Sequence, residues 1–385
     1  MKYPNNPQAV KNYLTHRRNF LKGSLLLSTG LLLNQRSTAR ASEAPAASTA
    51  PRRSKVSFVT GTDRREMMNQ VLSPLKDVIA EGIKGKQIVI KPNFVSTNSP
   101  LCATHVDAVR GVLDFLKPMY SGKIIIGESP AGGSAMPGFE NYGYMPLQNE
   151  YGITFEDFNS LSSKPAWILD RNLYPTEIQL ISRLIDPNSY IISLTRLKTH
   201  NTVIATMGLK NIVMGVPINS RASGSKRLMH GASPRWLHYN MFLVAQKVRP
   251  HLTVIESVEG MEGNGPIGGT PVEHGVALAG TDVMAVDSIG AQLMDVPLEN
   301  IGYLNYCGNA GLGIIDRENI DIIGNEKPED HVIKYQLGRN IENQLEWMQP
   351  LQIQGGVGPF GSGGGGGGGR MRGGGGSDSG RRGGA

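Results

Sequence analysis

The stretch Tyr190–Gly215 reads YIISLTRLKTHNTVIATMGLKNIVMG, and it decides the fold prediction. Its apolar, β-branched beginning predicts a buried strand, and Lys198 and His200 follow where that strand should end. Because alternate residues of a strand share a face, we expect Arg196 on the same face as these two. A glycine-punctuated segment then adds Lys210. The stretch therefore predicts a buried strand that carries cations to one end of a sheet.

Strand and helix patterns alternate along the chain around this stretch. Apolar runs favour strands at residues 55–60, 87–90, 123–127, 190–195, 252–255 and 276–278. Helical spacing favours helices at residues 63–83, from 104 onward behind a capping-box pattern, at 234–248 and at 283–294. Such alternation implies parallel pairing through crossover helices. We expect an α/β fold with a mostly parallel, mixed sheet flanked by helices.

The first 41 residues differ from this core. Residues 15–22, THRRNFLK, resemble the twin-arginine export signal, and Ala39-Arg40-Ala41 forms a small-x-small cleavage site. The apolar run between them, residues 23–33, is shorter than the roughly 20 residues that span a bilayer, so no stable transmembrane anchor is expected. The pattern predicts passage through the twin-arginine machinery to the periplasm or another exported location. An uncleaved amphipathic anchor is the alternative.

Composition divides the rest of the chain into three parts. Residues 42–54 are rich in Ala, Ser and Pro and read as a linker. Residues 55–354 form the α/β core, as one large domain or two lobes. Residues 355–385 are rich in Gly and Arg with little to bury, so a disordered tail is expected, either a flexible tether or a passive extension.

Charge and cysteine content narrow the classes of function. The formal charge is +7, and the predicted signal holds seven cations and no acid, so subtracting these seven leaves zero for the rest. Nucleic-acid binding by the core therefore loses its support, because it needs a basic surplus. The two cysteines, Cys102 and Cys307, are too few and too far apart for an iron–sulfur motif, and they are either paired or free.

Polar side chains follow several of the expected strands. The carboxyl ends of parallel strands meet at one edge of a sheet, which is where open α/β sheets bind ligands. Burying lysines there is unfavourable unless an anion compensates. The sequence therefore predicts a site for a small anionic ligand, such as a carboxylate, a phosphate or a charged cofactor, built from residues at this edge: Lys91, Asn93, Glu128, Lys198, His200 and Glu256.

A glycine-rich segment, Gly260–Gly269, adds candidates from the second half of the chain. We expect it to be a loop in which Gly263 and Gly265 let backbone amides approach a ligand, with Glu262 beside them. Glycine-rich turns without a ligand are also common.

Two acids and a histidine complete the set. Asp282 fits an N-cap of the helix expected from residue 283, which is a structural role. Asp287 lies beyond the cap and is therefore the better candidate for a role in the site. His230 is expected in a loop, where it would join His200 as a proton carrier or metal ligand.

These segments, taken in order, resemble the bacterial and archaeal family called domain of unknown function 362. The resemblance runs from about residue 86 to residue 324 and implies an α/β fold with shared site positions. Many members carry a ferredoxin-type iron–sulfur module, which the two cysteines here cannot form, and this weakens a redox interpretation. The segments that carry the resemblance are Lys91-Pro92-Asn93, Leu197–His200, Gly208–Asn211, His230, Gly260–Pro266 and Asp282–Asp287.

Three functions stay open. One is an exported enzyme acting on a small anionic substrate, one a non-catalytic protein that binds a metal or an anion, and one an envelope interaction protein. The identity of any cofactor or metal is open as well. The catalytic candidates are His200, His230, Glu262 and Asp287, and the ligand-binding candidates are Lys91, Asn93, Glu128, Lys198, Lys210, Asn211, Gly263 and Gly265.

Overall fold

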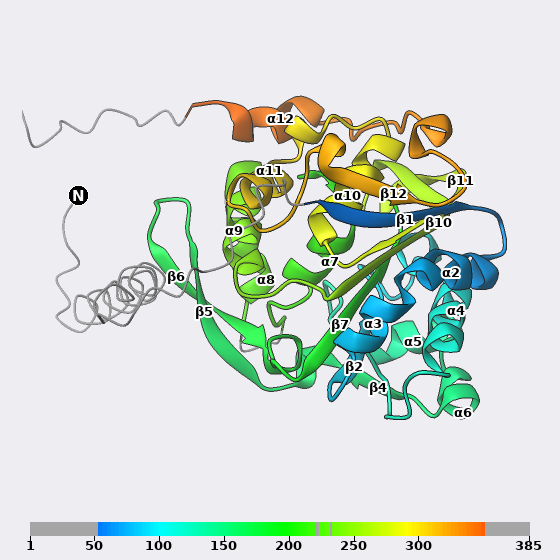
Figure 1. Ribbon diagram of the computed structural model, residues 1–385. Coiled ribbons are helices and arrows are strands. Elements are labelled where there is room, and N and C mark those ends of the chain that lie inside the picture. Colours follow the sequence, from blue (N-terminus) through cyan, green and yellow to red (C-terminus); the bar gives the residue numbers. More distant parts are fainter. Residues whose placement is uncertain (1–52, 220–222, 232, 351–385) are drawn as a thin grey trace, which may run out of the picture. The chain divides into compact units, whose positions relative to one another are not determined.

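The computed structural model describes residues 53–219, 223–231 and 233–350 (Figure 1). The predicted signal and the predicted tail lie outside these residues, and so does the linker except for its last two positions. Ser54 already belongs to the first strand. The described residues up to Met348 belong to one compact unit.

A ten-stranded mixed sheet forms the centre of this unit, in the order β12-β1-β11-β10-β7-β2-β3-β4, with β8 paired to β10 and β9 paired to β8. A separate two-stranded sheet joins β5 to β6. The strands are β1 Ser54–Thr60, β2 Gln87–Lys91, β3 Ile125–Glu128, β4 Thr154–Asp157, β5 Ser163–Leu169, β6 Pro175–Ile181, β7 Ser189–Thr195, β8 Lys198–His200, β9 Ile204–Thr206, β10 Leu252–Asn264, β11 Gly268–Gly280 and β12 Ile320–Ile323.

The part of the sheet that positions the site is parallel. Strands β10, β7, β2, β3 and β4 pair in parallel, whereas β11 pairs antiparallel with both β10 and β1. The prediction of a mostly parallel, mixed sheet is therefore confirmed.

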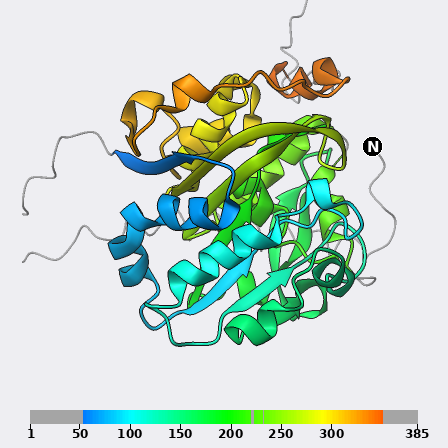
Figure 2. The ribbon, with the colours of Figure 1, turned by 90° about the vertical axis from the view of Figure 1, so that its right-hand side faces the viewer.

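Helices cover both faces of the sheet, and Figures 1 and 2 show the two layers. Residues of α2 to α6 pack in one apolar cluster, and residues of α7 to α11 pack in another. The helices are α2 Arg64–Leu72, α3 Lys76–Gly82, α4 Val106–Leu116, α5 Met136–Asn141, α6 Leu147–Tyr151, α7 Gly208–Val213, α8 Ser225–His230, α9 Pro234–Ala245, α10 Val283–Leu293, α11 Gly302–Asn309 and α12 Ile341–Leu345.

Strand β2 shows why a continuous apolar run suits this position. Ile88 and Ile90 pack in the cluster with α2 to α6, and Val89, which points the other way, packs in the cluster with α7 to α11. A strand with helices on both faces needs apolar residues at every position. The apolar run of β2 ends at Lys91, the last residue of the strand, and Lys91 lines the cleft described below.

Several local predictions need correction. The helix expected over residues 63–83 is broken at Pro74, where a 3₁₀ turn separates α2 from α3, because proline lacks the amide that a helix interior uses. The predicted capping box does not form: His105 caps α4 by accepting the Asp107 amide at 3.2 Å. The hydroxyl of Thr104 donates instead to the carbonyl of Leu194 at 2.8 Å.

The strand expected over residues 190–195 is confirmed as β7, and a break in the pairing separates it from Lys198 and His200. Strand β7 ends at Thr195, and β8 begins at Lys198 and pairs with Met261 of β10. The break turns Arg196 away from the cleft described below, because its guanidinium contacts Glu259 at 3.3 Å.

Candidate functional site

A cleft of about 460 Å³ opens where the parallel strands β2 and β3 end. Side chains from β8, α7 and α8 complete its walls, and the tip of the β10–β11 hairpin reaches it through Pro266 and Ile267. The polar and charged residues that line it are Lys91, Asn93, Glu128, Ser129, His200, Asn201, Thr202, Thr206, Lys210, Asn211, Asn219, Lys226, Arg227 and His230.

A buried ion pair forms the floor of the cleft. The Lys91 ammonium lies 2.6 Å from the Glu128 carboxylate, and each residue is 1 % exposed. Glu128 also accepts backbone amides from Phe94 at 2.7 Å and Ser129 at 2.6 Å, so protein donors already engage both of its oxygens. Burial lowers the pKa of Lys91, and Glu128 opposes that shift. Two backbone amides therefore hold the Glu128 carboxylate in place, in addition to its attraction to Lys91.

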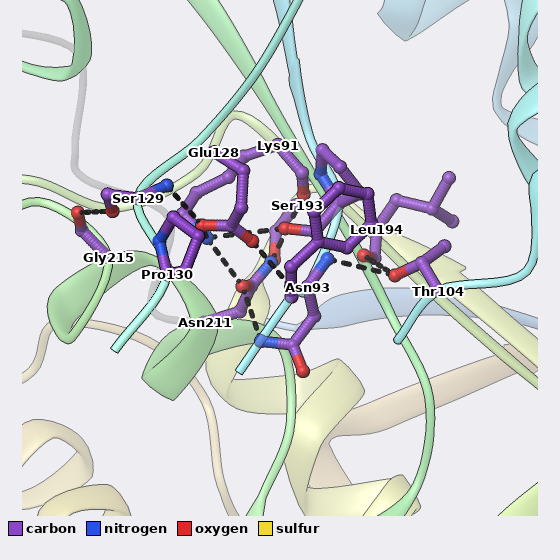
Figure 3. A network of polar contacts seen from close by, with 12 residues as sticks. Lys91, Asn93, Thr104, Glu128, Ser129, Pro130, Ser193, Leu194, Asn211 and Gly215 are labelled. Atoms are coloured by element: carbon purple, nitrogen blue, oxygen red, sulfur yellow. Dashed lines mark hydrogen bonds and ion pairs between the residues drawn. The ribbon is translucent and has the colours of Figure 1, made fainter. Parts of the chain in front are cut away.

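Asn211 links α7 to the strand ends, as Figure 3 shows. Its side-chain oxygen accepts from Lys91 at 2.9 Å and from Asn93 at 3.0 Å. Its side-chain nitrogen donates to the Lys91 carbonyl and to the Ser193 hydroxyl, each at 3.1 Å. The amide is therefore satisfied at both ends and fixes the position of α7.

Lys198 is a buried structural cation outside the cleft. Its ammonium donates to the Cys102 carbonyl at 2.7 Å and to the Asn93 side chain, and the residue is fully buried. Burial lowers the pKa of Lys198 to about 7. The sequence placed this lysine at the strand end correctly, but its amine faces the protein interior.

Lys226 lines the cleft and is absent from the set that sequence reasoning assembled. Its ammonium donates to the Ser129 carbonyl, to the Ser129 hydroxyl at 3.1 Å and to the Pro130 carbonyl at 3.2 Å. Burial lowers its pKa to about 7. One signal was present: Lys226 lies four residues before His230, so the two share a helix face.

Lys210 differs from the other lysines of this region. It is 9 % exposed and lines the cleft, yet its amine makes no hydrogen bond to any residue that the structure describes. Burial, and next the charge of Lys91, lower its pKa to about 7. It is a nearly buried amine for which the described part of the chain supplies no acceptor.

The two histidines of the cleft both engage the protein through Nδ1, and their free Nε2 atoms differ in protonation. His200 accepts the Thr202 amide at Nδ1 over 2.9 Å, which assigns the proton of its neutral form to Nε2. His230 has Nδ1 2.8 Å from the Lys226 carbonyl, an acceptor, which assigns its proton to Nδ1 and leaves Nε2 basic. Burial, and next the charge of Lys210, hold the pKa of His200 well below its ordinary value.

The glycine-rich segment is a β-hairpin and not an open loop. The amide of Gly263 donates to the Gln336 carbonyl at 2.6 Å, and the Glu262 carboxylate accepts the Gln336 amide at 2.7 Å. The carbonyl of Gly265 accepts from Asn201 at 2.8 Å. Glu262, Gly263 and Gly265 therefore brace the hairpin and do not line the cleft.

Asp287 also lies away from the cleft. Its two carboxylate oxygens accept the amides of Gly208 at 2.8 Å and Leu209 at 2.9 Å, so it caps the start of α7 from α10. Burial raises the pKa of Asp287 to about 7, and the two amides oppose this. Glu256 likewise lies outside the cleft and pairs with Arg64 at 2.9 Å.

Within residues 53–219, 223–231 and 233–350, no group of three or more His, Cys, Asp or Glu side chains is placed to hold a metal ion. Cys102 and Cys307 are buried and free, which resolves the question of their pairing. In the same described part of the chain, no helix has the length and apolarity needed to cross a membrane.

Residues 88–292 match a family model described as Domain of unknown function (DUF362). The chain belongs to this family. The match contains every cleft residue named above, and the resemblance expected from the sequence is confirmed.

A relative is the thylakoid-associated protein sll1697 of Synechocystis sp. (strain ATCC 27184 / PCC 6803 / Kazusa), which is 29 % identical over 216 residues. The alignment covers 55 % of this chain and 64 % of that protein. This DUF362 protein thus spans less than two thirds of the relative's length.

Two solved structures align with part of this chain. The lactate racemase apoprotein from Thermoanaerobacterium thermosaccharolyticum aligns over 55 % of this chain and 51 % of its own, with a TM-score of 0.37 and 15 % identity. A protein from Thermotoga maritima aligns over 53 % of this chain and 52 % of its own, with a TM-score of 0.34 and 13 % identity.

Proposed function

We propose that this DUF362 protein is an enzyme that binds a small anionic substrate in the cleft between β2, β3, α7 and α8. The observation that carries the proposal is Lys210, a cleft-lining amine that is 9 % exposed and has no acceptor among the described residues. A nearly buried ammonium without a partner is unfavourable, and a bound carboxylate or phosphate supplies the missing acceptor.

The size of the pKa shift indicates how much an anion would contribute. The pKa of Lys210 falls from 10.5 to about 7. Since one pKa unit corresponds to about 1.4 kcal/mol, the buried ammonium is disfavoured by on the order of 5 kcal/mol. An anion that restores the ordinary pKa recovers part of this free energy. Lys226 and Arg227 line the same cleft and add positive charge to it.

The histidines are the groups that turn binding into catalysis. His200 offers a hydrogen-bond donor at Nε2, and His230 offers a basic Nε2, so one substrate can meet a hydrogen-bond donor and a general base in one cleft. The proposed chemistry is acid–base chemistry, which uses no iron–sulfur cluster, and we propose that this member works without the ferredoxin module.

Isothermal titration calorimetry with inorganic phosphate and with succinate tests the anion site. We expect Lys210→Met to weaken binding of the better ligand at least tenfold, because the uncompensated cation is removed. Lys84→Met is the matched control, since Lys84 pairs with Glu81 on the surface, where both side chains are more than 70 % exposed. Equal affinities of wild type and Lys210→Met, or no binding of either anion, would contradict the proposal.

Export remains a proposal of its own, motivated by the residues THRRNFLK at positions 15–22. The paired guanidinium groups of Arg17 and Arg18 are the recognition feature, and lysine cannot copy their planar geometry. The Arg17→Lys, Arg18→Lys double variant should accumulate as precursor in the cytoplasm, as cell fractionation and immunoblotting would show. Normal export of that variant would rule out the twin-arginine route.

A further inference from the structure

Among the described residues, four buried lysines lie in or next to the cleft, and three of them hold their amines in hydrogen bonds or an ion pair. Lys91 is bound by Glu128 and Asn211, Lys198 by a carbonyl and an amide oxygen, and Lys226 by three oxygens. Lys210 makes no hydrogen bond with the described residues, and it lines the cleft. A ligand in the cleft can therefore reach the Lys210 amine without displacing a protein hydrogen bond.

We propose that Lys210 is a nucleophile that forms an imine with a carbonyl substrate, and that the substrate class is the 2-oxo acids. This inference rests on the proposed function, because the carboxylate of a 2-oxo acid is the anion that the cleft binds. When Lys210 reacts, the protonated imine keeps a positive charge at its nitrogen, and Arg227 lines the same cleft. The adjacent ketone then brings an electrophilic carbon to the amine. The cleft, at about 460 Å³, lies within the range of small-molecule sites.

The surroundings of Lys210 favour the neutral, nucleophilic amine. Burial and the charge of Lys91 lower its pKa from 10.5 to about 7, which raises the unprotonated fraction of the amine at neutral pH. Desolvation beside a second cation is a known route to an active lysine. The other titratable and charged groups of the cleft are Lys91 and Glu128 at the ends of β2 and β3, His200 on β8, and Lys226, Arg227 and His230 on α8.

The covalent step balances without an oxidant or a reductant. The Lys210 nitrogen adds to the ketone carbon, and one of its protons moves to the oxygen to give a carbinolamine. The hydroxyl then takes up a proton and leaves as water, so amine, ketone and one proton yield a protonated imine and water. His230 accepts the amine proton at Nε2 and passes it to the oxygen, and the second proton comes from solvent. The N–H at Nε2 of His200 donates a hydrogen bond to the substrate oxygen.

Reductive trapping tests the imine. The full chain is incubated with pyruvate or 2-oxoglutarate and sodium cyanoborohydride, and the adduct is located by peptide mass mapping. We expect one equivalent of adduct, on Lys210. Lys198 is an internal control, because its pKa is also about 7 while its amine lies outside the cleft. An adduct on Lys198, or one spread over surface lysines, would overturn the assignment.

Lys210→Arg separates the imine from the anion site. Arginine keeps the positive charge but cannot form the imine, so this variant should bind phosphate within a few fold of wild type and give no trapped adduct. If wild type binds phosphate but traps no 2-oxo acid, the imine is wrong and the anion site stands. If wild type binds no anion, the proposed function is contradicted, and so is the imine proposal that rests on it.

Discussion

Glu128 neutralises the deepest cation of the cleft. Its pairing with Lys91 lies at the carboxyl ends of two parallel strands, where each residue is 1 % exposed. In Glu128→Gln, a neutral amide faces a buried ammonium, and breaking one side of a buried pair typically costs about 3–5 kcal/mol. We expect urea denaturation to show a loss of stability of that order.

The exposed pair of Glu81 and Lys84 provides the control. Its side chains are 73 % and 71 % exposed, so water already solvates both charges. Glu81→Gln should leave the urea midpoint almost unchanged. Equal losses of stability in Glu81→Gln and Glu128→Gln would contradict the expectation that the buried Lys91–Glu128 pair stabilises the protein more than the exposed pair does.

At the residue scale, sequence reasoning found the strand-end part of the cleft and missed the part that α8 supplies. Lys91, Asn93 and Glu128 follow apolar strands, so the rule for parallel sheet edges predicts their meeting. Lys226 reaches the Ser129 carbonyl, 97 positions away in the sequence. No local pattern encodes that contact, because it depends on how the helix packs in three dimensions.

At the element scale, helix α7 depends on an acid from another helix. Met207 at its N-cap position provides no side-chain cap, and Asp287 of α10 accepts the amides of Gly208 and Leu209 instead. Asp287→Asn replaces one of the two accepting oxygens by an NH₂ group, which leaves a buried amide facing a donor. We expect a loss of about 1–3 kcal/mol in urea denaturation and weaker anion binding, because α7 carries Lys210.

Asp77→Asn is the comparison, since Asp77 is an exposed residue in the first turn of α3. It should change stability little and leave anion binding intact. If Asp287→Asn is as stable as wild type, then the α10 carboxylate is not what holds the beginning of α7.

The β10–β11 hairpin shows why element predictions failed where glycine was frequent. Glycine and proline between residues 260 and 269 favour a loop by local chemistry. In the structure glycine is needed for close packing: a Cβ on Gly265 would lie 2.1 Å from the Thr199 carbonyl oxygen, and one on Gly269 would lie 2.2 Å from that of Glu262. Cross-strand pairing overrides local propensity here.

At the scale of the whole molecule, the buried lysines link stability to pH. Burial lowers the pKa values of Lys198, Lys210 and Lys226 from 10.5 to about 7. In the unfolded chain these amines stay protonated up to about pH 10, so between about pH 7 and pH 9 the unfolded state binds more protons. Stability should therefore rise with pH in this window, by up to about 1.4 kcal/mol per pH unit for each lysine.

Urea midpoints at pH 7, 8 and 9, measured without ligand, check this slope. Lys210→Met should flatten it, because one of the shifted groups is gone. The window ends near pH 9 because of Cys307. Burial raises the pKa of its thiol from 9 to about 12, so above pH 9 the thiol lowers stability as the pH rises. A midpoint that stays level or falls from pH 7 to pH 9 would contradict the assignment of the three amines.

The position of β11 has a consequence for where this protein can be divided. One neighbour of this 13-residue strand, β10, lies inside the family-matched segment, but the other, β1, lies upstream of residue 88, where that segment begins. A fragment limited to residues 88–292 would leave β11 as an unpaired edge, which invites self-association. The segment that matches the family is thus smaller than the sheet that it belongs to. A fragment for expression should include β1, so that β11 keeps both of its partner strands.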